Sequence, residues 1–247
     1  IVHKHISNGG VAIFLKDNYI TLATGNGLLK SLSVKQIPAA YGGKLLYNIE
    51  NCLAAFSVAY ALNIPLQTIE GALTSFYCDE IHNPGRFNVY NIRDFRVVVD
   101  YGHNLASYTR VADAVKKMGG SRLIGIIGTP GDRSNESVRS VGNIAGESFH
   151  RVIIKEDKNS RGRKPGEISQ LLMDGALDAG ISKKAVTLIP KEDDALRIAI
   201  QEASAGDIIV IFYEDLECIT NVINQETSKV ENENRKKDLS KFMLVKA

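Results

Sequence analysis

Three hydrogen-bonding side chains follow an apolar run in the segment VVVDYGHN, where Asp100, His103 and Asn104 come directly after three valines. Such a run is typical of a buried strand, and open parallel α/β sheets bind ligands outside the carboxyl ends of their strands. Asp100 is therefore predicted either to accept hydrogen bonds from a ribose diol or to cap a turn or helix. His103 and Asn104 are predicted either to contact an adenine edge or to act as caps.

Two more polar loops follow the next two predicted strands. GTPGDR, residues 128–133, has glycines three apart and ends in Arg133, so its backbone either binds an anion or forms a plain tight turn. KEDKNSRGRKPGE, residues 155–167, mixes both signs of charge, which is usual for a solvated loop but also suits a zwitterionic substrate. An arginine guanidinium can bind the carboxylate of such a substrate at two points, and acidic side chains can bind its amine or a guanidinium. Glu214 and Asp215 of the last loop are alternative partners for a guanidinium.

The 247 residues contain no GxxxxGK[ST] segment, so the chain lacks the phosphate-wrapping loop of a P-loop ATPase. The chain also starts without Met and in the middle of a pattern, and we expect it to be a fragment.

The composition is that of an ordinary globular protein, with 44% hydrophobic and 23% charged residues. A net charge of +2 gives no reason to expect nucleic acid or a membrane surface as a partner. No apolar run approaches the ~18 residues of a membrane span. The three cysteines have neither metal-ligand spacing nor the pattern of a disulfide framework. We expect a cytoplasmic protein with no metal site within this chain.

The first 84 residues are predicted to form a small α+β region. Residues 11–24 favour a hairpin around a turn at residues 16–18, and residues 47–62 favour a buried amphipathic helix. A second helix is predicted to begin at Pro65. Four of its side chains are expected to face inward: Leu66, Ile69, Leu73 and Phe76. The breaker-rich loop at residues 78–86 is predicted to hold the domain boundary.

The remaining residues alternate short apolar strands with helices of about a dozen residues, which predicts an α/β fold with a mostly parallel sheet covered on both faces. Residues 86–92 are expected to add an antiparallel edge strand, and the polar tail from residue 224 is expected to be loosely held. The other strands are predicted at residues 95–100, 122–128, 151–155, 185–189 and 207–214. The helices are predicted at residues 107–118, 135–148, 165–180 and in the stretch that ends at 203.

Six segments together resemble the Mur ligase family of ATP-dependent amide-forming enzymes. YNIENCLAA, NPGRFNVY and VVVDYGHN, in that order, are typical of the whole family. GTPGDR, IIKEDKNSRGRKPGE and GDIIVIFYEDLE look like the C-terminal part of its cyanophycin synthetase group, bacterial enzymes that attach arginine to a poly-aspartate backbone. The resemblance covers residues 11–220. It implies the end of a P-loop central domain at residues 1–84, a Rossmann-like C-terminal domain at residues 85–223 and a polar tail at residues 224–247.

The resemblance also implies site residues, although it points to no catalytic group. The implied ATP-binding residues are Asn48, Asn51, Arg86, Asp100, His103 and Asn104. The residues implied to face the incoming amino acid are Arg133, Glu156, Asp157, Arg161, Arg163 and Glu167. The chain departs from the family pattern at Gly102, where alanine is usual, and at Leu105, where proline is common. A more mobile loop is expected there.

The implied reaction is amide formation through an acyl phosphate, in which ATP phosphorylates a carboxylate and an amine displaces phosphate. It implies ATP, with Mg²⁺ ligands mostly outside this chain, and arginine and a poly-aspartate chain as partners. Two alternatives stay open: a Mur-family ligase for another amino acid, and a non-catalytic nucleotide-binding α/β module. Homo-oligomer formation is also left open.

We predict that the 247-residue chain by itself does not turn over ATP, because it lacks the loop that wraps the β- and γ-phosphates. Phosphate release would be measured with ATP, Mg²⁺, arginine and an aspartate-chain primer. Turnover well above a buffer blank would contradict this prediction.

Overall fold

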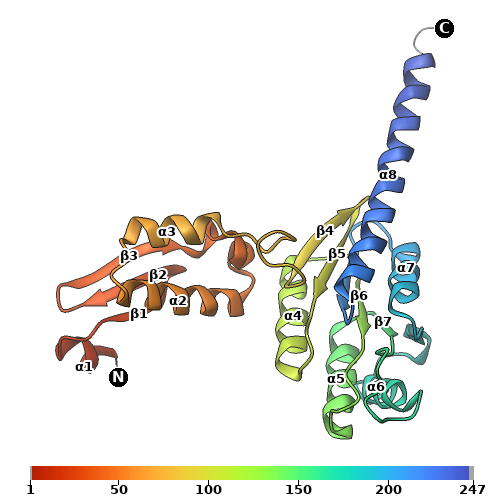
Figure 1. The fold of residues 1–247 in the computed structure, drawn as a ribbon, viewed down its shortest axis with the longest axis horizontal. Helices are drawn as coiled ribbons and strands as arrows, with labels where there is room; N and C mark the ends of the chain where they lie inside the picture. The colour runs from red at the N-terminus through yellow and green to blue at the C-terminus, as the bar shows by residue number, and fades with distance from the viewer. Residues whose placement is uncertain (1, 245–247) are drawn as a thin grey trace. The chain divides into compact units, whose positions relative to one another are not determined.

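The structure, a computed structural model, describes residues 2–244 and their side chains through residue 232. The chain divides into two compact units, Ile1–Asn83 (unit 1) and Pro84–Ala247 (unit 2). The division lies within the breaker-rich loop of the sequence, between Asn83 and Pro84. Figure 1 shows the labelled helices and strands of each unit.

Unit 1 combines a three-stranded antiparallel sheet with two helices of more than two turns. The predicted hairpin is present, with Asp17 and Asn18 at positive φ in its turn, and a third strand follows it. That strand was missed because most of its residues, including Leu28 and Leu29, are exposed and give no alternating pattern. The elements in chain order are α1 (Val2–Ser7), β1 (Ala12–Lys16), β2 (Tyr19–Thr24), β3 (Gly27–Ser33), the 3-10 helices η1 (Val34–Gln36) and η2 (Pro38–Gly43), α2 (Leu46–Ala61) and α3 (Leu66–Ser75).

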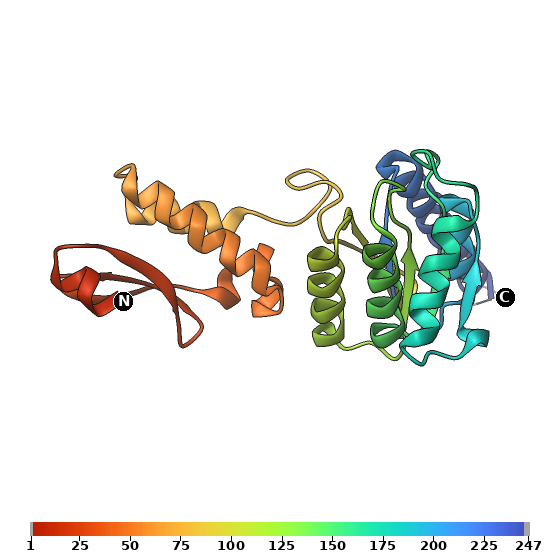
Figure 2. The same ribbon diagram turned by 90° about the horizontal axis from the view of Figure 1, so that it is seen from below.

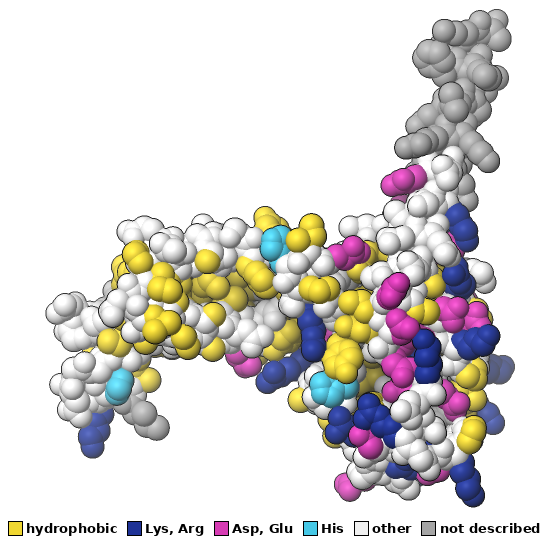
Figure 3. Space-filling model, in the orientation of Figure 1, with side chains coloured by type: hydrophobic (Ala, Val, Ile, Leu, Met, Phe, Trp, Pro, Cys, Tyr) yellow, Lys and Arg dark blue, Asp and Glu magenta, His cyan; other side chains and the backbone are white. Residues whose placement is uncertain are grey.

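The core of unit 1 joins β2 to α2 and α3 through Ile20, Ile49, Phe56 and Ile69. Leu66 and Leu73 pack against this core as predicted. The prediction for Phe76 was wrong, because α3 ends at Ser75 and the Phe76 side chain is 41% exposed. In Figure 3 the visible face of unit 1 carries mostly hydrophobic and uncharged side chains, whereas both signs of charge lie side by side over unit 2.

Unit 2 contains a six-stranded sheet in the order β4-β5-β9-β6-β7-β8. Its strands are β4 (Asn88–Ile92), β5 (Phe95–Asp100), β6 (Leu123–Ile127), β7 (Arg151–Ile154), β8 (Val186–Leu188) and β9 (Ile208–Phe212). The β4–β5 pair is antiparallel and every other pair is parallel. The predicted α/β fold with an antiparallel edge strand is therefore confirmed.

Helices cover both faces of this sheet. Figure 2 shows α4, α5 and α6 side by side on one face, with α8 behind them. On the other face, Leu196 of α7 and Ile219 of α8 pack on alternate strand residues such as Val97 and Val99. The helices of unit 2 are α4 (Leu105–Met118), α5 (Asn135–Ser148), α6 (Glu167–Asp178), the 3-10 helix η3 (Lys183–Ala185), α7 (Glu192–Glu202) and α8 (Leu216–Leu244).

Strand β9 is the last in the sequence but lies between β5 and β6, paired in parallel with both. The carboxyl ends of β5, β9, β6 and β7 therefore meet at one edge of the sheet. In spatial order, this edge carries the loops at residues 100–104, 213–215, 128–134 and 155–166.

The expectation of a loosely held tail from residue 224 was wrong for residues 224–230, because α8 continues through them and Val230 packs against the core; beyond Val230 it stays a prediction. Its buried face continues past Val222 and Ile223 to Val230, which packs against the core, and Arg197 of α7 donates to Oε1 of Gln225 at 2.8 Å. Val230 lies seven positions, about two helical turns, after Ile223 and therefore on the same face, although the overall composition is polar. Residues 245–247 of the predicted tail lie outside the described residues. Among the described residues, no helix combines the length and the hydropathy that a membrane span requires.

We predict that Ile219→Ala lowers the free energy of unfolding by about 2–5 kcal/mol, because it leaves a cavity where α8 meets the sheet. Denaturant unfolding of the variant would measure this. Lys229→Ala, on an exposed face of the same helix, is the control and should change stability by less than about 0.5 kcal/mol. A loss below 1 kcal/mol for Ile219→Ala would show that this part of α8 contributes little.

Candidate functional site

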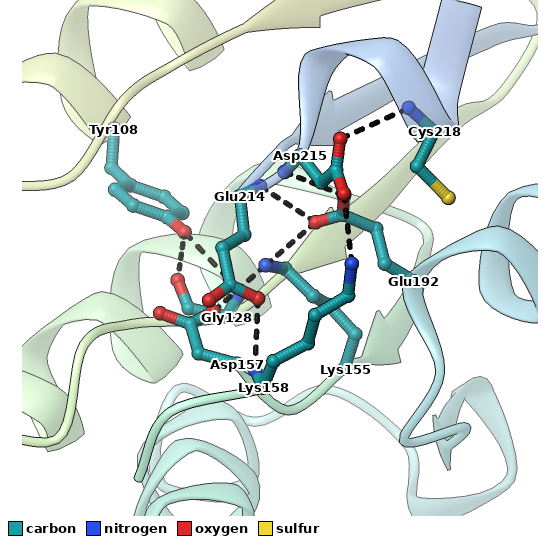
Figure 4. A network of polar contacts seen from close by, with 9 residues as sticks. All are labelled: Tyr108, Gly128, Lys155, Asp157, Lys158, Glu192, Glu214, Asp215 and Cys218. Carbon is teal, nitrogen blue, oxygen red and sulfur yellow. Dashed lines mark hydrogen bonds and ion pairs between the residues drawn. The ribbon is translucent and has the colours of Figure 1, made fainter. Parts of the chain in front are cut away.

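A buried lysine lies at the carboxyl edge of the sheet, directly after β7 (Figure 4). Lys155 is 1% exposed, and its Nζ lies 2.8 Å from Oδ1 of Asp157 and 2.7 Å from Oε2 of Glu192. Burial lowers the pKa of Lys155, but the Glu192 and Asp157 carboxylates outweigh that effect and hold the pKa above its usual value. The lysine is therefore a charged group held between two acids.

Glu192, at the start of α7, connects this lysine to the turn between β9 and α8. Its Oε2 accepts a hydrogen bond from the backbone N–H of Glu214 at 2.7 Å, and its Oε1 accepts one from Asp215 N–H at 3.0 Å. Neither Lys155 nor Glu192 was among the predicted site residues. The available signal was a lysine directly after the buried run RVII, whereas nothing in the sequence pairs it with a residue of α7.

Gly128, at the end of β6, makes room for the lysine. A Cβ atom at this position would lie 2.7 Å from Cε of Lys155. Tyr108 of α4 covers the other side, where its hydroxyl donates to the carbonyl of Gly128 at 2.5 Å and its ring stacks on Phe212 at 3.8 Å between centroids. The first glycine of GTPGDR is thus explained by packing.

Arg163 joins the loop after β7 to the loop after β6. Its Nε donates to the carbonyl of Gly131 at 2.8 Å, and its Nη2 donates to the carbonyl of Arg133. Its Nη1 lies 2.6 Å from both Oδ1 of Asn135 and Oε1 of Glu167. The fork predicted to hold a substrate carboxylate is therefore occupied by the protein's own acceptors.

The two glutamates of the loop after β7 also have partners within the protein. Oε1 of Glu156 accepts hydrogen bonds from Gly166 N–H at 2.9 Å and from the Ser169 hydroxyl at 2.6 Å, so Glu156 caps the start of α6. Gly166 lies at φ +82°, and α6 accordingly begins at Glu167 and not at the predicted Pro165. The Arg163 guanidinium holds the pKa of Glu167 below its usual value.

Arg161 and Asp157 form fewer or more exposed bonds with the rest of the protein than Arg163 and Glu156 do. Nη1 of Arg161 lies 2.6 Å from Oδ2 of Asp132, and both side chains are about half exposed, at 47% and 50%. An exposed ion pair of this kind contributes little to stability, so Arg161 readily exchanges its partner. Oδ1 of Asp157 contacts Lys155, and no described residue binds its Oδ2. Nε of Arg133 is buried with no partner among the described residues.

A small polar hollow of about 60 Å³ lies at this edge and holds a few water molecules at most. Residues from all four loops line it, among them His103, Pro130, Lys155, Asp157, Arg161, Tyr213 and Glu214. The hollow combines one exchangeable cation with acidic oxygens, which is the charge pattern of a site for a zwitterion with an additional cation.

Asp100 and Asn104 serve as turn and cap formers in this structure, one of the two roles predicted for each. Asp100 is 6% exposed, and its carboxylate accepts hydrogen bonds from Phe87 N–H at 3.0 Å and Gly102 N–H at 2.8 Å. Burial raises the pKa of Asp100, and these two hydrogen bonds oppose the shift. Oδ1 of Asn104 accepts from Ser107 N–H at 2.9 Å and caps α4, which begins earlier than predicted, at Leu105.

Gly102 was expected to make this loop mobile, but the structure gives a different reason for the glycine. Gly102 is buried, its N–H is bonded to Asp100, and a Cβ atom there would lie 2.7 Å from the Phe212 ring. Lack of space therefore favours glycine at this position, and the expected mobility of the loop stays a prediction.

His103 and Arg86 both surround the ring of Tyr101. The Arg86 guanidinium lies over this ring at 4.8 Å, and the His103 ring packs against it at 5.1 Å between centroids. Nδ1 of His103 is buried, and no described residue forms a hydrogen bond with it. His103 therefore retains an unused polar atom in the wall of the hollow.

In unit 1, Asn48 and Asn51 line a mostly apolar cavity of about 430 Å³ beside α2 and α3. Asn48 is 8% exposed and donates to the Ala39 carbonyl at 2.8 Å and to Sγ of Cys78 at 3.3 Å. Asn51 is exposed, and its amide donates to Oδ1 of Asn48 at 3.3 Å. The cavity is large enough for a heterocycle, and Asn51 has the accessible amide.

No group of three or more His, Cys, Asp or Glu side chains is arranged to hold a metal ion in the part of the chain that the structure describes.

The chain belongs to the Mur ligase family, because the family model described as "Mur ligase, glutamate ligase domain" matches residues 85–212. The family resemblance predicted from the sequence is thus confirmed. Among curated proteins, the chain is similar to a cyanophycin synthetase of Crocosphaera subtropica, with 33% identity over 225 residues that cover 91% of this chain and 26% of that protein. The chain thus spans about a quarter of the length of that relative.

The chain is also similar to a ligase of another name and to a solved structure. A UDP-N-acetylmuramoyl-L-alanyl-D-glutamate--2,6-diaminopimelate ligase of Alkaliphilus metalliredigens is 31% identical over 204 residues, which cover 81% of this chain and 38% of that protein. The solved structure of E. coli FolC in complex with ADP superposes with a TM-score of 0.59 at 17% identity, covering 92% of this chain and 47% of that one. At this identity the superposition shows a shared fold.

We predict that Arg163→Lys lowers the free energy of unfolding by about 1.5–3 kcal/mol, because lysine keeps the charge but loses the fork that binds two backbone carbonyls. Arg161→Lys is the matched control and should leave stability unchanged, since its ion pair is exposed. Thermal and denaturant unfolding would compare the two. Equal stability for both variants would mean that Arg163 does not hold the loops together.

Proposed function

We propose that this chain is the C-terminal portion of an ATP-dependent amide ligase of the cyanophycin synthetase type, which attaches arginine to aspartate side-chain carboxylates through an acyl phosphate. The observation that carries the proposal is the charge pattern of the hollow at the carboxyl edge of the unit 2 sheet. The likeness to cyanophycin synthetase over 91% of the chain supports it.

Free arginine presents a carboxylate, an amine that must be neutral when it attacks, and a guanidinium that is always charged. The hollow is smaller than arginine, so the amino acid is proposed to bind across its mouth, where Arg161 suits the carboxylate because its present ion pair is exposed and exchangeable. Asp157 and Glu214 suit the two nitrogen groups. Lys155 does not cancel these acids, because Glu192 balances its charge from behind the hollow.

The other residues implied for the amino acid act indirectly in this proposal. Glu156 and Arg163 hold the shape of the loop that carries Asp157 and Arg161, since their polar atoms bind the protein itself. Glu167 pairs with Arg163. Arg133, with a buried Nε that no described residue binds, is a further candidate for contact with the substrate.

Each unit offers its own candidates for contact with a nucleotide: we propose Asn51 in unit 1 and, separately, His103 and Arg86 in unit 2. A side-chain amide can bond both a donor and an acceptor on an adenine edge, and Asn51 is the accessible amide at the unit 1 cavity. His103 has the unused buried ring nitrogen, and Arg86 is an exposed cation. Asn48, Asp100 and Asn104 act by holding the backbone near these groups. Ligands for Mg²⁺ are proposed to lie mostly outside this chain.

The test is ATP-dependent amide formation by the full-length protein with Mg²⁺ and a poly-aspartate primer. Arginine, lysine, diaminopimelate and glutamate would be supplied separately, and the products identified by mass spectrometry. Arginine is expected to be the preferred amine. Preference for another amino acid would make the protein a ligase of different specificity, and ATP binding without any product would favour a non-catalytic nucleotide-binding module.

We predict that Asp157→Asn raises the KM for arginine roughly ten- to hundred-fold, because a charge-assisted hydrogen bond worth about 1.5–3 kcal/mol is lost. The KM for ATP should be unchanged. Steady-state kinetics of the full-length protein would measure both constants. Asp178→Asn, which breaks an exposed ion pair with Arg139 away from this edge, is the matched control and should change neither constant. An unchanged KM for arginine in Asp157→Asn would place recognition of the amine elsewhere.

A further inference from the structure

Lys155 is buried and charged, yet it takes no part in the reaction proposed above. Its ammonium is bonded on one side to Asp157 and on the other to Glu192, at 2.8 and 2.7 Å. Buried ion pairs are a weak source of net stability, because desolvation of the two charges offsets most of their attraction. The role of this lysine is therefore to be found in what its bonds position.

The first group that Lys155 positions is the carboxylate of Asp157. The Asp157 side chain is 12% exposed and lines the hollow, and Lys155 is bonded to its Oδ1. The other oxygen, Oδ2, is bound by no described residue. A carboxylate held at one oxygen by a buried cation has little freedom to rotate, so Oδ2 stays in a fixed direction for a ligand.

The second group lies on the other side of Glu192. The two oxygens of Glu192 accept the backbone N–H groups of Glu214 and Asp215, and one of them also accepts from Lys155. The end of β7 and the turn after β9 are thereby joined through one ammonium group, as Figure 4 shows. Asp157 stands on one of these segments and Glu214 on the other, and both line the hollow.

We propose that Lys155 is a positioning residue for the amino-acid substrate: it orients Asp157 directly and the Glu214 segment through Glu192, so that the two carboxylates face the nitrogen groups of a cationic amino acid. This inference rests on the proposed function. Glu192 has a second part in it, since its charge cancels that of Lys155 and leaves the two lining acids with a net negative charge. A neutral residue at position 192 would let the lysine neutralise Asp157.

The experiment compares Lys155→Met with the charge-balanced double variant Lys155→Met/Glu192→Gln in the full-length protein. The single variant places two acids together without their cation and is expected to lower the melting temperature. The double variant removes one of these charges and should recover part of that loss. In both variants the KM for arginine is expected to rise at least ten-fold, whereas kcat at saturating arginine and the KM for ATP change less than about three-fold.

Lys158→Met is the matched control, because Lys158 makes an ion pair with Asp215 at the same edge but is 71% exposed. It should leave the KM for arginine within about two-fold of the wild-type value. If the role of Lys155 is purely structural, its replacement lowers kcat and the affinities for ATP and arginine together. The KM for arginine would then not change more than the other constants.

The outcomes separate this inference from the proposed function. A folded wild-type protein that forms no amide with any amino acid overturns the proposed function and this inference with it. An active wild type, with a wild-type KM for arginine in a folded Lys155 variant, overturns only the positioning role. Failure of both Lys155 variants to fold would show that the lysine is needed for the fold itself, which also overturns the assignment.

Discussion

Parallel pairing of β9 with both β5 and β6 is the constraint on which the rest of unit 2 depends. A strand from the end of the domain is placed in the middle of the sheet, so its carboxyl end lies between two loops that come about eighty and more than a hundred residues earlier. Because ligands of open parallel sheets bind at this edge, the position of β9 decides which polar residues become neighbours. Glu214 meets the loop after β7 only for this reason, as its carboxylate accepts from Lys158 N–H at 2.8 Å.

The polar residues at this edge fall into two groups: those that bind the protein's own backbone and those that remain available to a ligand. Asp100, Glu156 and Arg163 use their hydrogen-bonding atoms on backbone groups of the protein and hold the loops in shape. Asp157 has one carboxylate oxygen, Oδ2, that no described residue binds, and Arg161 has only an exposed ion pair with Asp132. Both side chains can therefore bind a ligand. A buried polar group without a partner is costly, so the first group is needed whether or not a ligand is bound. Of these five residues, only Asp157 and Arg161 are therefore proposed to contact the substrate.

The fold by itself does not select a substrate. The structure superposes on FolC, and the sequence is similar both to cyanophycin synthetases and to diaminopimelate ligases, whose names indicate different substrates. What distinguishes members of such a family is the local arrangement of charge on a shared framework. In this chain, we propose that this arrangement is the cluster around Lys155, in which Glu192 balances the charge of the lysine and Asp157 lines the hollow.

The sequence by itself determined the elements of unit 2 and their class of sheet. Strands buried on both faces are continuous apolar runs, and helices between them repeat at 3.6 residues, so β5 and α5 were predicted with the bounds that they have. The family and the polar edge also followed from local segments. Strand β3 and the packed part of α8 were missed, because one is largely exposed and the other is polar in composition.

Tertiary structure decided the strand order and the partner of each charge. Pairing of β9 with β5 joins Val97 to Ile209, and the bond of Lys155 to Glu192 joins the ends of different βα units. Such contacts are chosen by the packing of the whole domain, and no local pattern encodes them. The roles of Arg163 and Asp100 were open in the sequence for the same reason: the charge of a side chain is local information, but the atoms that satisfy it are brought to it by the fold.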